Sequence, residues 1–266
     1  MFKQGLLLQM IRVRSHRFFL LLILVLIGEN IAYPQHKIIV ATAANVQYAM
    51  SELGTEFTHE TGIALSVIIG SSGQLTAQIN EGAPYDIFIS ADMKYPLSLY
   101  KKNIAVDPPK VYAEGSLVLW TMLKGIKPDK NLSILLSKKI DKIALANPRT
   151  APYGTAAVQT LKKYGIYDKL KNKFVYGESI APTNHFIYTG AAEIGFTAKS
   201  VVLSPKMKDK GSWIEIDPGS YKPIEQGCVI LQYGYDNHKT EVIKFYKFLF
   251  SGKAKNILTK YGYIVR

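Results

Sequence analysis

The apolar run Lys37-Ile38-Ile39-Val40-Ala41-Thr42 is followed at once by three small or amide residues, Ala43-Ala44-Asn45. A continuous apolar run of this length predicts a buried strand. Residues 46–61 then carry apolar side chains at helical spacing, and Gly62 follows as a residue that ends helices. A buried strand that leads directly into an amphipathic helix is the repeating unit of an α/β fold.

Units of this kind recur along the rest of the chain. Further strands are predicted at residues 63–69, 86–90, 142–146, 173–176 and 193–197. Further helices are predicted at residues 74–80, 155–164, 182–189, 239–250 and 254–261. This alternation of strands and helices over most of the chain predicts an α/β fold.

Small, hydroxyl or amide side chains stand at four of the junctions where a strand passes into a helix. These junctions contain Asn45, Ser72, Tyr153 and Ile180. The start of a helix offers unpaired N–H groups and the positive end of the helix dipole. Strand ends in an open α/β sheet meet at the ligand crevice. The four junctions together predict one anion-binding site.

Each junction also has a purely structural interpretation. Asn45 is a preferred helix-capping residue, and Ser71 and Ser72 are typical of tight turns. Tyr153 is one of 17 tyrosines, many of which serve in packing. Ile180 has no polar side chain, so only its backbone can contribute. The sequence leaves these alternatives open at each position.

Enzymatic motifs are missing from the sequence. It contains neither a Gly-x-Ser-x-Gly nucleophile motif nor a phosphate-binding Gly-x-x-x-x-Gly-Lys-Ser/Thr loop. His59, His185 and His238 are isolated from one another, so no metal site is expected, and His59 and His238 are expected to be exposed. Glu178 is the carboxylate nearest a candidate junction, and a structural role is expected for it. Ser72 with His185 is the pair that an ester hydrolase would require.

The composition indicates a folded protein with an excess of basic residues. Of the 266 residues, 48% are hydrophobic and 20% are charged, which excludes intrinsic disorder. The net charge is +13, but the lysines are scattered in pairs such as Lys101-Lys102 and Lys162-Lys163. A nucleic-acid partner is therefore not expected, because it requires a basic stripe with interleaved aromatic residues. The single cysteine, Cys228, lies in an apolar run and is expected to be a buried free thiol.

The N-terminal segment predicts export. Four basic residues precede an apolar run at residues 18–27, which is too short to span a bilayer stably. This pattern is typical of a signal peptide, predicted here as residues 1–32 with cleavage after Ala32. Met10 is an alternative start, and an uncut peptide would act as an inner-membrane anchor. The mature protein is expected to be exported and soluble.

From Lys37 onward, the chain resembles the periplasmic molybdate-binding proteins of molybdate ABC importers. The most specific stretch is Gly82-Ala83-Pro84-Tyr85-Asp86-Ile87-Phe88-Ile89-Ser90-Ala91-Asp92. The other matching stretches are residues 40–45, 70–75, 77–79, 115–120, 147–148, 151–154 and 261–263. The resemblance implies a two-lobed periplasmic-binding-protein fold of type II, in which each lobe is a mixed sheet flanked by helices.

By the same resemblance, the chain passes between the lobes twice, near Glu114 and near Tyr221. Lobe 1 would contain residues 37–114 and 222–266, and lobe 2 would contain residues 115–221. The ligand would lie between the lobes, which close around it by a hinge motion. The protein would be a periplasmic monomer that delivers its ligand to an inner-membrane molybdate ABC permease.

The resemblance implies that the ligand is molybdate or tungstate. Its contacts would be the side chain and amide of Asn45, the hydroxyl and amide of Ser72, and the backbone amides of Tyr153 and Ile180. Ala44 is a fifth expected contact. No cofactor and no bare metal ion are expected, since the molybdenum is bound as its oxyanion.

One departure from the family pattern concerns a corner of this site. One branch of the family has serine at the position of Asn45 and a tyrosine hydroxyl donor at the position of Ala198. This chain resembles the other branch, which has asparagine and the turn Ala151-Pro152-Tyr153-Gly154. The donor that replaces the tyrosine hydroxyl is left open.

Neutral donors suit a fully deprotonated dianion, because hydrogen bonds to a charged acceptor are individually strong. Protonated phosphate would leave its own hydrogen unpaired in a cage made only of donors. Glu178 could accept that hydrogen, and it is predicted to point away from the cleft. Three alternatives stay open: a receptor for sulfate or phosphate, an exported ester hydrolase, and a ferric-ion receptor that uses tyrosine hydroxyls.

Overall fold

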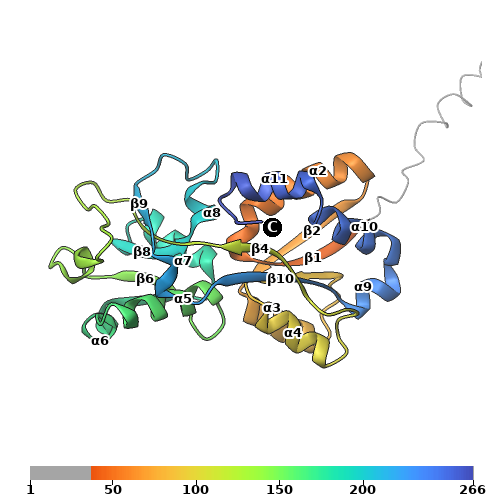
Figure 1. Ribbon diagram of the computed structural model, residues 1–266, viewed down its shortest axis with the longest axis horizontal. Helices are drawn as coiled ribbons and strands as arrows, with labels where there is room; N and C mark the ends of the chain where they lie inside the picture. The colour runs from red at the N-terminus through yellow and green to blue at the C-terminus, as the bar shows by residue number, and fades with distance from the viewer. Residues whose placement is uncertain (1–36, 266) are drawn as a thin grey trace, which may run out of the picture. The chain divides into compact units, whose positions relative to one another are not determined.

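The computed structural model describes residues 37–265, and two mixed five-stranded sheets organise them (Figure 1). The first sheet has the strand order β2-β1-β3-β10-β4. Strand β1 runs parallel to β2 and β3, and β10 runs antiparallel to β3 and β4. These strands are β1 (Lys37–Ala43), β2 (Ala64–Gly70), β3 (Ile87–Ile89), β4 (Lys110–Gly115) and β10 (Ile224–Ile230). The α/β prediction is confirmed.

Helices cover both faces of the first sheet. One face packs on α2 (Gln47–Thr61) and α10 (Lys239–Leu249), with Met50, Phe57 and Phe245 in the shared core. The other face packs on α3 (Ser72–Asn80) and α4 (Lys94–Lys101). The remaining helical segments of this half are η1 (Ala44–Val46), α9 (Gln232–Asn237) and α11 (Gly252–Lys260).

The second sheet has the strand order β7-β6-β8-β5-β9 and is also mixed. Its strands are β5 (Leu117–Thr121), β6 (Ile143–Ala146), β7 (Phe174–Gly177), β8 (Ile194–Ala198) and β9 (Ser212–Glu215). Its helical segments are η2 (Ser133–Leu136), α5 (Pro152–Lys163), α6 (Tyr167–Leu170), η3 (Lys171–Lys173), α7 (Ile180–Tyr188), α8 (Lys199–Val202) and η4 (Pro218–Ser220). Helix α5 packs on one face of the sheet and α7 on the other, each through buried apolar side chains.

The chain passes from one sheet to the other twice. The first passage lies between β4 and β5, where only Ser116 separates the two strands. The second lies between the end of β9 at Glu215 and the start of β10 at Ile224. The resemblance implies crossings between lobes near Glu114 and near Tyr221. The division of the chain into two separately moving lobes at these points stays a prediction.

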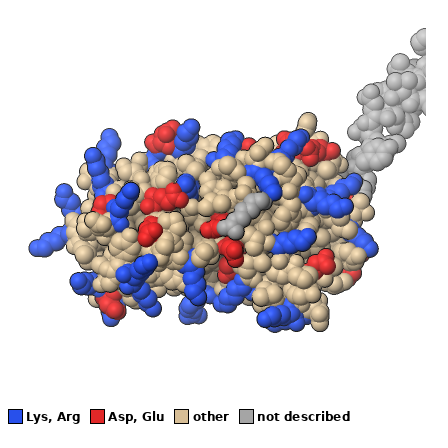
Figure 2. All heavy atoms as spheres, in the orientation of Figure 1, with Lys and Arg blue, Asp and Glu red and all other residues tan. Residues whose placement is uncertain are grey.

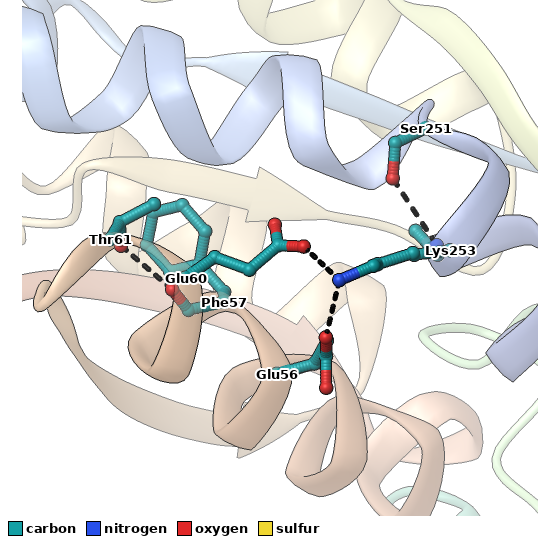
Figure 3. A network of polar contacts seen from close by, with 7 residues as sticks. Glu56, Phe57, Glu60, Thr61, Ser251 and Lys253 are labelled. Carbon is teal, nitrogen blue, oxygen red and sulfur yellow. Dashed lines mark hydrogen bonds and ion pairs between the residues drawn. The ribbon is translucent and has the colours of Figure 1, made fainter.

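The C-terminal helix α11 is tied to α2 by exposed ion pairs. Lys253 reaches from the start of α11 to Glu56, at 2.9 Å, and to Glu60 (Figure 3). Further along the same two helices, Lys260 pairs with Glu52 at 2.9 Å. The helix itself is held by Ala254 and Leu258, which are buried in the first core, and Tyr263 of the chain end that follows is buried in the same core.

Three helices begin earlier than their sequence patterns predict, and each now starts at a candidate site residue or next to one. Helix α3 begins at Ser72 because Ser71 caps it: its hydroxyl accepts from Gln74 N at 3.2 Å. Helix α5 begins with Pro152, a residue that suits the first helical position. Helix α7 begins at Ile180. The apolar pattern alone does not register these first turns, because each contributes a single buried side chain, that of Ser72, Tyr153 or Ile180, rather than an apolar stripe.

Other predictions are confirmed or corrected by the described residues. Cys228 is a buried free thiol in β10, and burial raises its pKa above the ordinary value. His238 was expected in a solvated loop, but it is half-buried and its Nδ1 lies 2.8 Å from Oδ1 of the fully buried Asp86. This pairing arises because a buried carboxylate requires hydrogen-bonded partners.

The surface and the N-terminal segment add two observations. Lysine and arginine side chains lie scattered over the face shown in Figure 2, with acidic residues between them. No helix within residues 37–265 is both long and apolar enough to cross a membrane. The predictions of a signal peptide over 1–32, of cleavage after Ala32 and of a start at Met10 lie outside the described residues.

Candidate functional site

The structure brings all five predicted ligand residues together around one small cavity. Its lining is Ala43, Ala44, Asn45, Gly70, Ser71, Ser72, Ala91, Ala151, Pro152, Tyr153, Ser179 and Ile180. Elements of the first sheet supply the lining up to Ala91, and elements of the second sheet supply the rest. The cavity is small, with a volume of about 10 Å³.

Four helical segments begin at this cavity. Ser72 and Ile180 are the first residues of α3 and α7, Tyr153 is the second residue of α5, and Asn45 lies in η1. The N–H groups of a helix's first turn have no partner within the helix. The lining contains no charged side chain. The cavity therefore offers neutral donors and the positive ends of helix dipoles, which favour an anion.

Ser71 and Ser72 have different roles, although the sequence treats them alike. The hydroxyl of Ser71 belongs to the capping box of α3, where it donates to Gln74 Oε1 and accepts from Gln74 N. The hydroxyl oxygen of Ser72 instead accepts from Ala91 N at 3.0 Å. That bond leaves the hydroxyl hydrogen of Ser72 available to a ligand, and it fixes the position of the oxygen.

Asn45 is not a helix cap, so that alternative is wrong. The residue that caps η1 is Ala43, and Asn45 lies inside the segment. Its side chain is buried, and Nδ2 donates to Gln226 Oε1 and to the hydroxyl of Tyr263, both at 3.0 Å. Its backbone oxygen accepts from Ser200 Oγ at 2.7 Å and from the Tyr263 hydroxyl at 3.0 Å. Asn45 is thus the residue through which a buried polar network reaches the cavity lining.

Gln226 is the centre of that network. Its Oε1 also accepts from the Tyr112 hydroxyl at 2.6 Å, and its Nε2 donates to the Tyr153 hydroxyl at 3.1 Å. Burial raises the pKa of Tyr112, Tyr153 and Tyr263, which keeps their hydroxyls neutral. Gly115 leaves room for this arrangement, since a Cβ there would overlap the Tyr153 hydroxyl and lie 2.5 Å from Gln226 Nε2.

Sequence reasoning missed Gln226, Tyr112 and Tyr263 as parts of the site. Gln226 is fully buried in β10, among residues that are otherwise apolar or small from Gly227 to Ile230. A glutamine inside a buried strand requires hydrogen-bond partners. That conflict between polarity and burial was the one available signal. The signal does not indicate which tyrosines would hydrogen-bond to Gln226.

Direct hydrogen bonds join the two halves beside the cavity. Gly73 N donates to Thr150 O at 2.9 Å, and the Tyr95 hydroxyl donates to Arg149 O at 3.1 Å. Gln74 Nε2 lies 3.4 Å from Glu178 Oε2. The side chain of Glu178 is exposed and is not part of the cavity lining. Glu178 is predicted to point away from the cleft, but its carboxylate contacts Gln74 of the other half, so it faces the cleft without lining the small cavity.

A larger pocket, of about 240 Å³, lies alongside and shares Ala151 and Pro152 with the cavity. It is lined in part by the carboxylate of Asp92, and burial raises the pKa of that carboxyl. Lys94 and Lys222 also line this pocket, so charge alone does not decide between the two. The smaller cavity is the better candidate for an oxyanion because three helices and η1 begin there.

The geometry of the alternative sites is unfavourable. Ser72 is buried, whereas His185 is exposed on α7, and the Ser72 oxygen is held by Ala91 N. No serine–histidine pair is formed by these two residues. The hydroxyl of Tyr153 lies in the network with Gln226. Ala198 is buried at the end of β8 and does not line the cavity.

Comparisons with known proteins agree with this architecture. The chain is 36% identical over 229 residues to the molybdate-binding protein ModA of Rhodobacter capsulatus, covering 86% of this chain and 88% of that one. It is 37% identical over 225 residues to ModA of Azotobacter vinelandii, covering 84% and 88%. The solved periplasmic molybdate-binding protein of Azotobacter vinelandii superposes with a TM-score of 0.81 at 33% identity, covering 86% of this chain and 99% of that one.

A protein family also matches nearly all of the described residues. The bacterial extracellular solute-binding proteins match residues 38–264, which include both sheets and every residue that lines the cavity. The chain belongs to the bacterial extracellular solute-binding protein family.

Proposed function

We propose that this protein captures molybdate or tungstate in the small cavity and delivers it to an ABC permease. The observation that carries the proposal is a cavity with no charged side chain at the start of three helices and η1. The relatives at 36% and 37% identity are named as molybdate-binding proteins. We assign ligand contacts to Ala44, Asn45, Ser72, Tyr153 and Ile180.

The donor set favours a fully deprotonated oxyanion. Each assigned contact offers an N–H or O–H group, and such bonds to a charged acceptor are shorter and stronger than neutral ones. A monoprotonated phosphate would bring a hydrogen that needs an acceptor, and Glu178 lies outside the lining. Molybdate and tungstate are both fully deprotonated at neutral pH, so the site is expected to bind both.

We also propose how the protein works in transport. Residues 37–114 with 222–266 would form one lobe and residues 115–221 the other, hinged at the two passages between the sheets. Each lobe supplies part of the cavity lining, so closure assembles the site and opening takes it apart. The protein would act as a periplasmic monomer after removal of residues 1–32, with an inner-membrane permease as its partner.

Calorimetric titration tests this proposal. Anion-free mature protein is prepared by unfolding, dialysis and refolding, and is titrated in parallel with molybdate, tungstate, sulfate and phosphate. We expect one-to-one binding of molybdate and tungstate that is much tighter than binding of sulfate or phosphate. If phosphate or sulfate binds most tightly, the cavity is still an oxyanion site, but the assignment of molybdate or tungstate as its ligand is refuted. A lack of heat with all four anions would refute an oxyanion receptor altogether.

A further inference from the structure

The side-chain amide of Asn45 is already committed within the protein. Both hydrogens of its Nδ2 are used, one by Gln226 Oε1 and one by the Tyr263 hydroxyl. Its Oδ1 is buried and has no hydrogen-bond partner among the described residues. In this orientation both donor hydrogens of the side chain are used, so it has none to offer an entering oxyanion.

The donor and acceptor roles in the hydrogen bonds of this network can nevertheless be exchanged. The nitrogen and oxygen of an amide are nearly equal in size, so a half-turn of Asn45 exchanges them without changing the packing. Oδ1 would then face Gln226, which must turn as well to present its Nε2. After that turn, Gln226 Oε1 would accept from the hydroxyl of Tyr153, which now lies 3.1 Å from Nε2. Tyr263 can donate to the turned Oδ1 while Ser200 keeps its 2.7 Å bond to the Asn45 backbone oxygen.

Tyr112 makes this double turn dependent on a ligand. Its hydroxyl donates to Gln226 Oε1 at 2.6 Å, and after the turn it would face Nε2 and have to accept. The hydroxyl hydrogen of a fully buried tyrosine would then lose its acceptor, which is unfavourable. A bond from Asn45 Nδ2 to a dianion offsets this loss, because hydrogen bonds to charged groups are the stronger ones.

We propose that Gln226 is a positioning residue of the anion site, whose amide turns together with that of Asn45 when an oxyanion enters the cavity. The turn converts Asn45 from an acceptor into a donor toward the ligand. Gln226 does not line the cavity and acts only through Asn45. This inference rests on the proposed function, since it requires an oxyanion in the cavity.

Nuclear magnetic resonance of the mature protein, labelled with 15N in its side-chain amides, tests the turn directly. Without anion, the amide hydrogens of Gln226 are expected to give nuclear Overhauser effects to the ring of Tyr153. With saturating molybdate, these effects should move to the ring of Tyr112, and the Asn45 amide resonances should shift. Molybdate binding with an unchanged contact to Tyr153 refutes this inference alone. Absence of any molybdate binding refutes the proposed function, and this inference with it.

Two variants give an independent readout in the same titration. Gln226→Met keeps the side-chain length but removes both hydrogen-bonding atoms, so molybdate affinity should fall roughly ten- to a hundredfold. Tyr112→Phe removes the group that opposes the turn, so it should bind molybdate as tightly as wild type or more tightly. Loss of affinity in Tyr112→Phe, or wild-type affinity in Gln226→Met, contradicts the linked turn. Thermal unfolding of each variant without anion verifies that it is folded. If Gln226→Met is not folded, the Tyr112→Phe variant and the resonance experiment still test the linked turn.

Discussion

Gly115 offers the sharpest test of the buried network, because the network needs the space that this glycine leaves. An alanine Cβ there would overlap the Tyr153 hydroxyl and lie 2.5 Å from Gln226 Nε2. Both neighbours are fully or almost fully buried, so neither can move into solvent. Gly115→Ala must therefore shift the strand or break the bond between Gln226 and Tyr153.

The expected loss of stability is substantial. Overpacking of a buried site costs roughly 1–3 kcal/mol, and a buried donor without its partner adds about 1–3 kcal/mol. Taking a total of about 2–4 kcal/mol, and about 2–4 °C per kcal/mol for a chain of this size, the unfolding temperature should fall by roughly 5–15 °C. Molybdate affinity should fall as well, because Asn45 loses the orientation that Gln226 provides.

Differential scanning calorimetry with and without molybdate measures both effects. Gly252→Ala is the matched control: a Cβ at Gly252 meets nothing within 4 Å, and the residue begins helix α11. That variant should unfold at the wild-type temperature or slightly above it. If Gly115→Ala unfolds and binds like Gly252→Ala, the argument for a tightly fitted network behind the site is refuted.

Further expectations concern the ligand and the surface. Ser72→Ala should weaken molybdate binding roughly ten- to a hundredfold in calorimetry, since it removes a hydroxyl donor to a charged acceptor; an unchanged affinity would contradict its assigned role. Molybdate affinity should be flat between about pH 6 and 9, because no lining side chain titrates there and burial raises the pKa of Tyr153; a steep pH dependence would indicate an ionised group in the site. Burial also raises the pKa of Asp92, so its stabilising contribution is present at acid pH and is lost as the pH rises through the raised value. Asp92→Asn should therefore exceed wild type in urea stability at pH 7 and match it at pH 3. Lys253→Met should leave the unfolding temperature nearly unchanged, because its ion pairs are exposed.

Much of the fold could be predicted from periodicity alone. The strand at Lys37–Ala43 and the helix at Gln47–Thr61 lie within a residue or two of their predicted bounds, because apolar runs and apolar stripes report burial directly. Helix starts were less predictable. Three of them begin two or three residues early: a capping box starts α3 and a proline starts α5, whereas α7 starts without a side-chain cap.

The residues that line the cavity could be predicted, but the buried residues that contact Asn45 could not. Ser72 and Tyr153 stand at helix starts that the sequence marks with glycine, serine or proline. Gln226 and Tyr263 contact Asn45 from 181 and 218 residues away in the chain. Such contacts depend on how β10 and the C-terminal segment pack, and neither local pattern nor spacing carries that information.

The division of the cavity lining between the two sheets has a mechanical consequence. Asn45 and Ser72 line the cavity from one side and Tyr153 and Ile180 from the other, so a ligand with the proposed contacts would be held from both sides. Hydrogen bonds weaken steeply once donor and acceptor separate beyond about 3.5 Å. Parting the halves by little more than the width of one such bond would remove half of the ligand's partners at once. Release would then need neither a proton nor a competing ion. A transporter that pulls the halves apart would unload the protein by force alone.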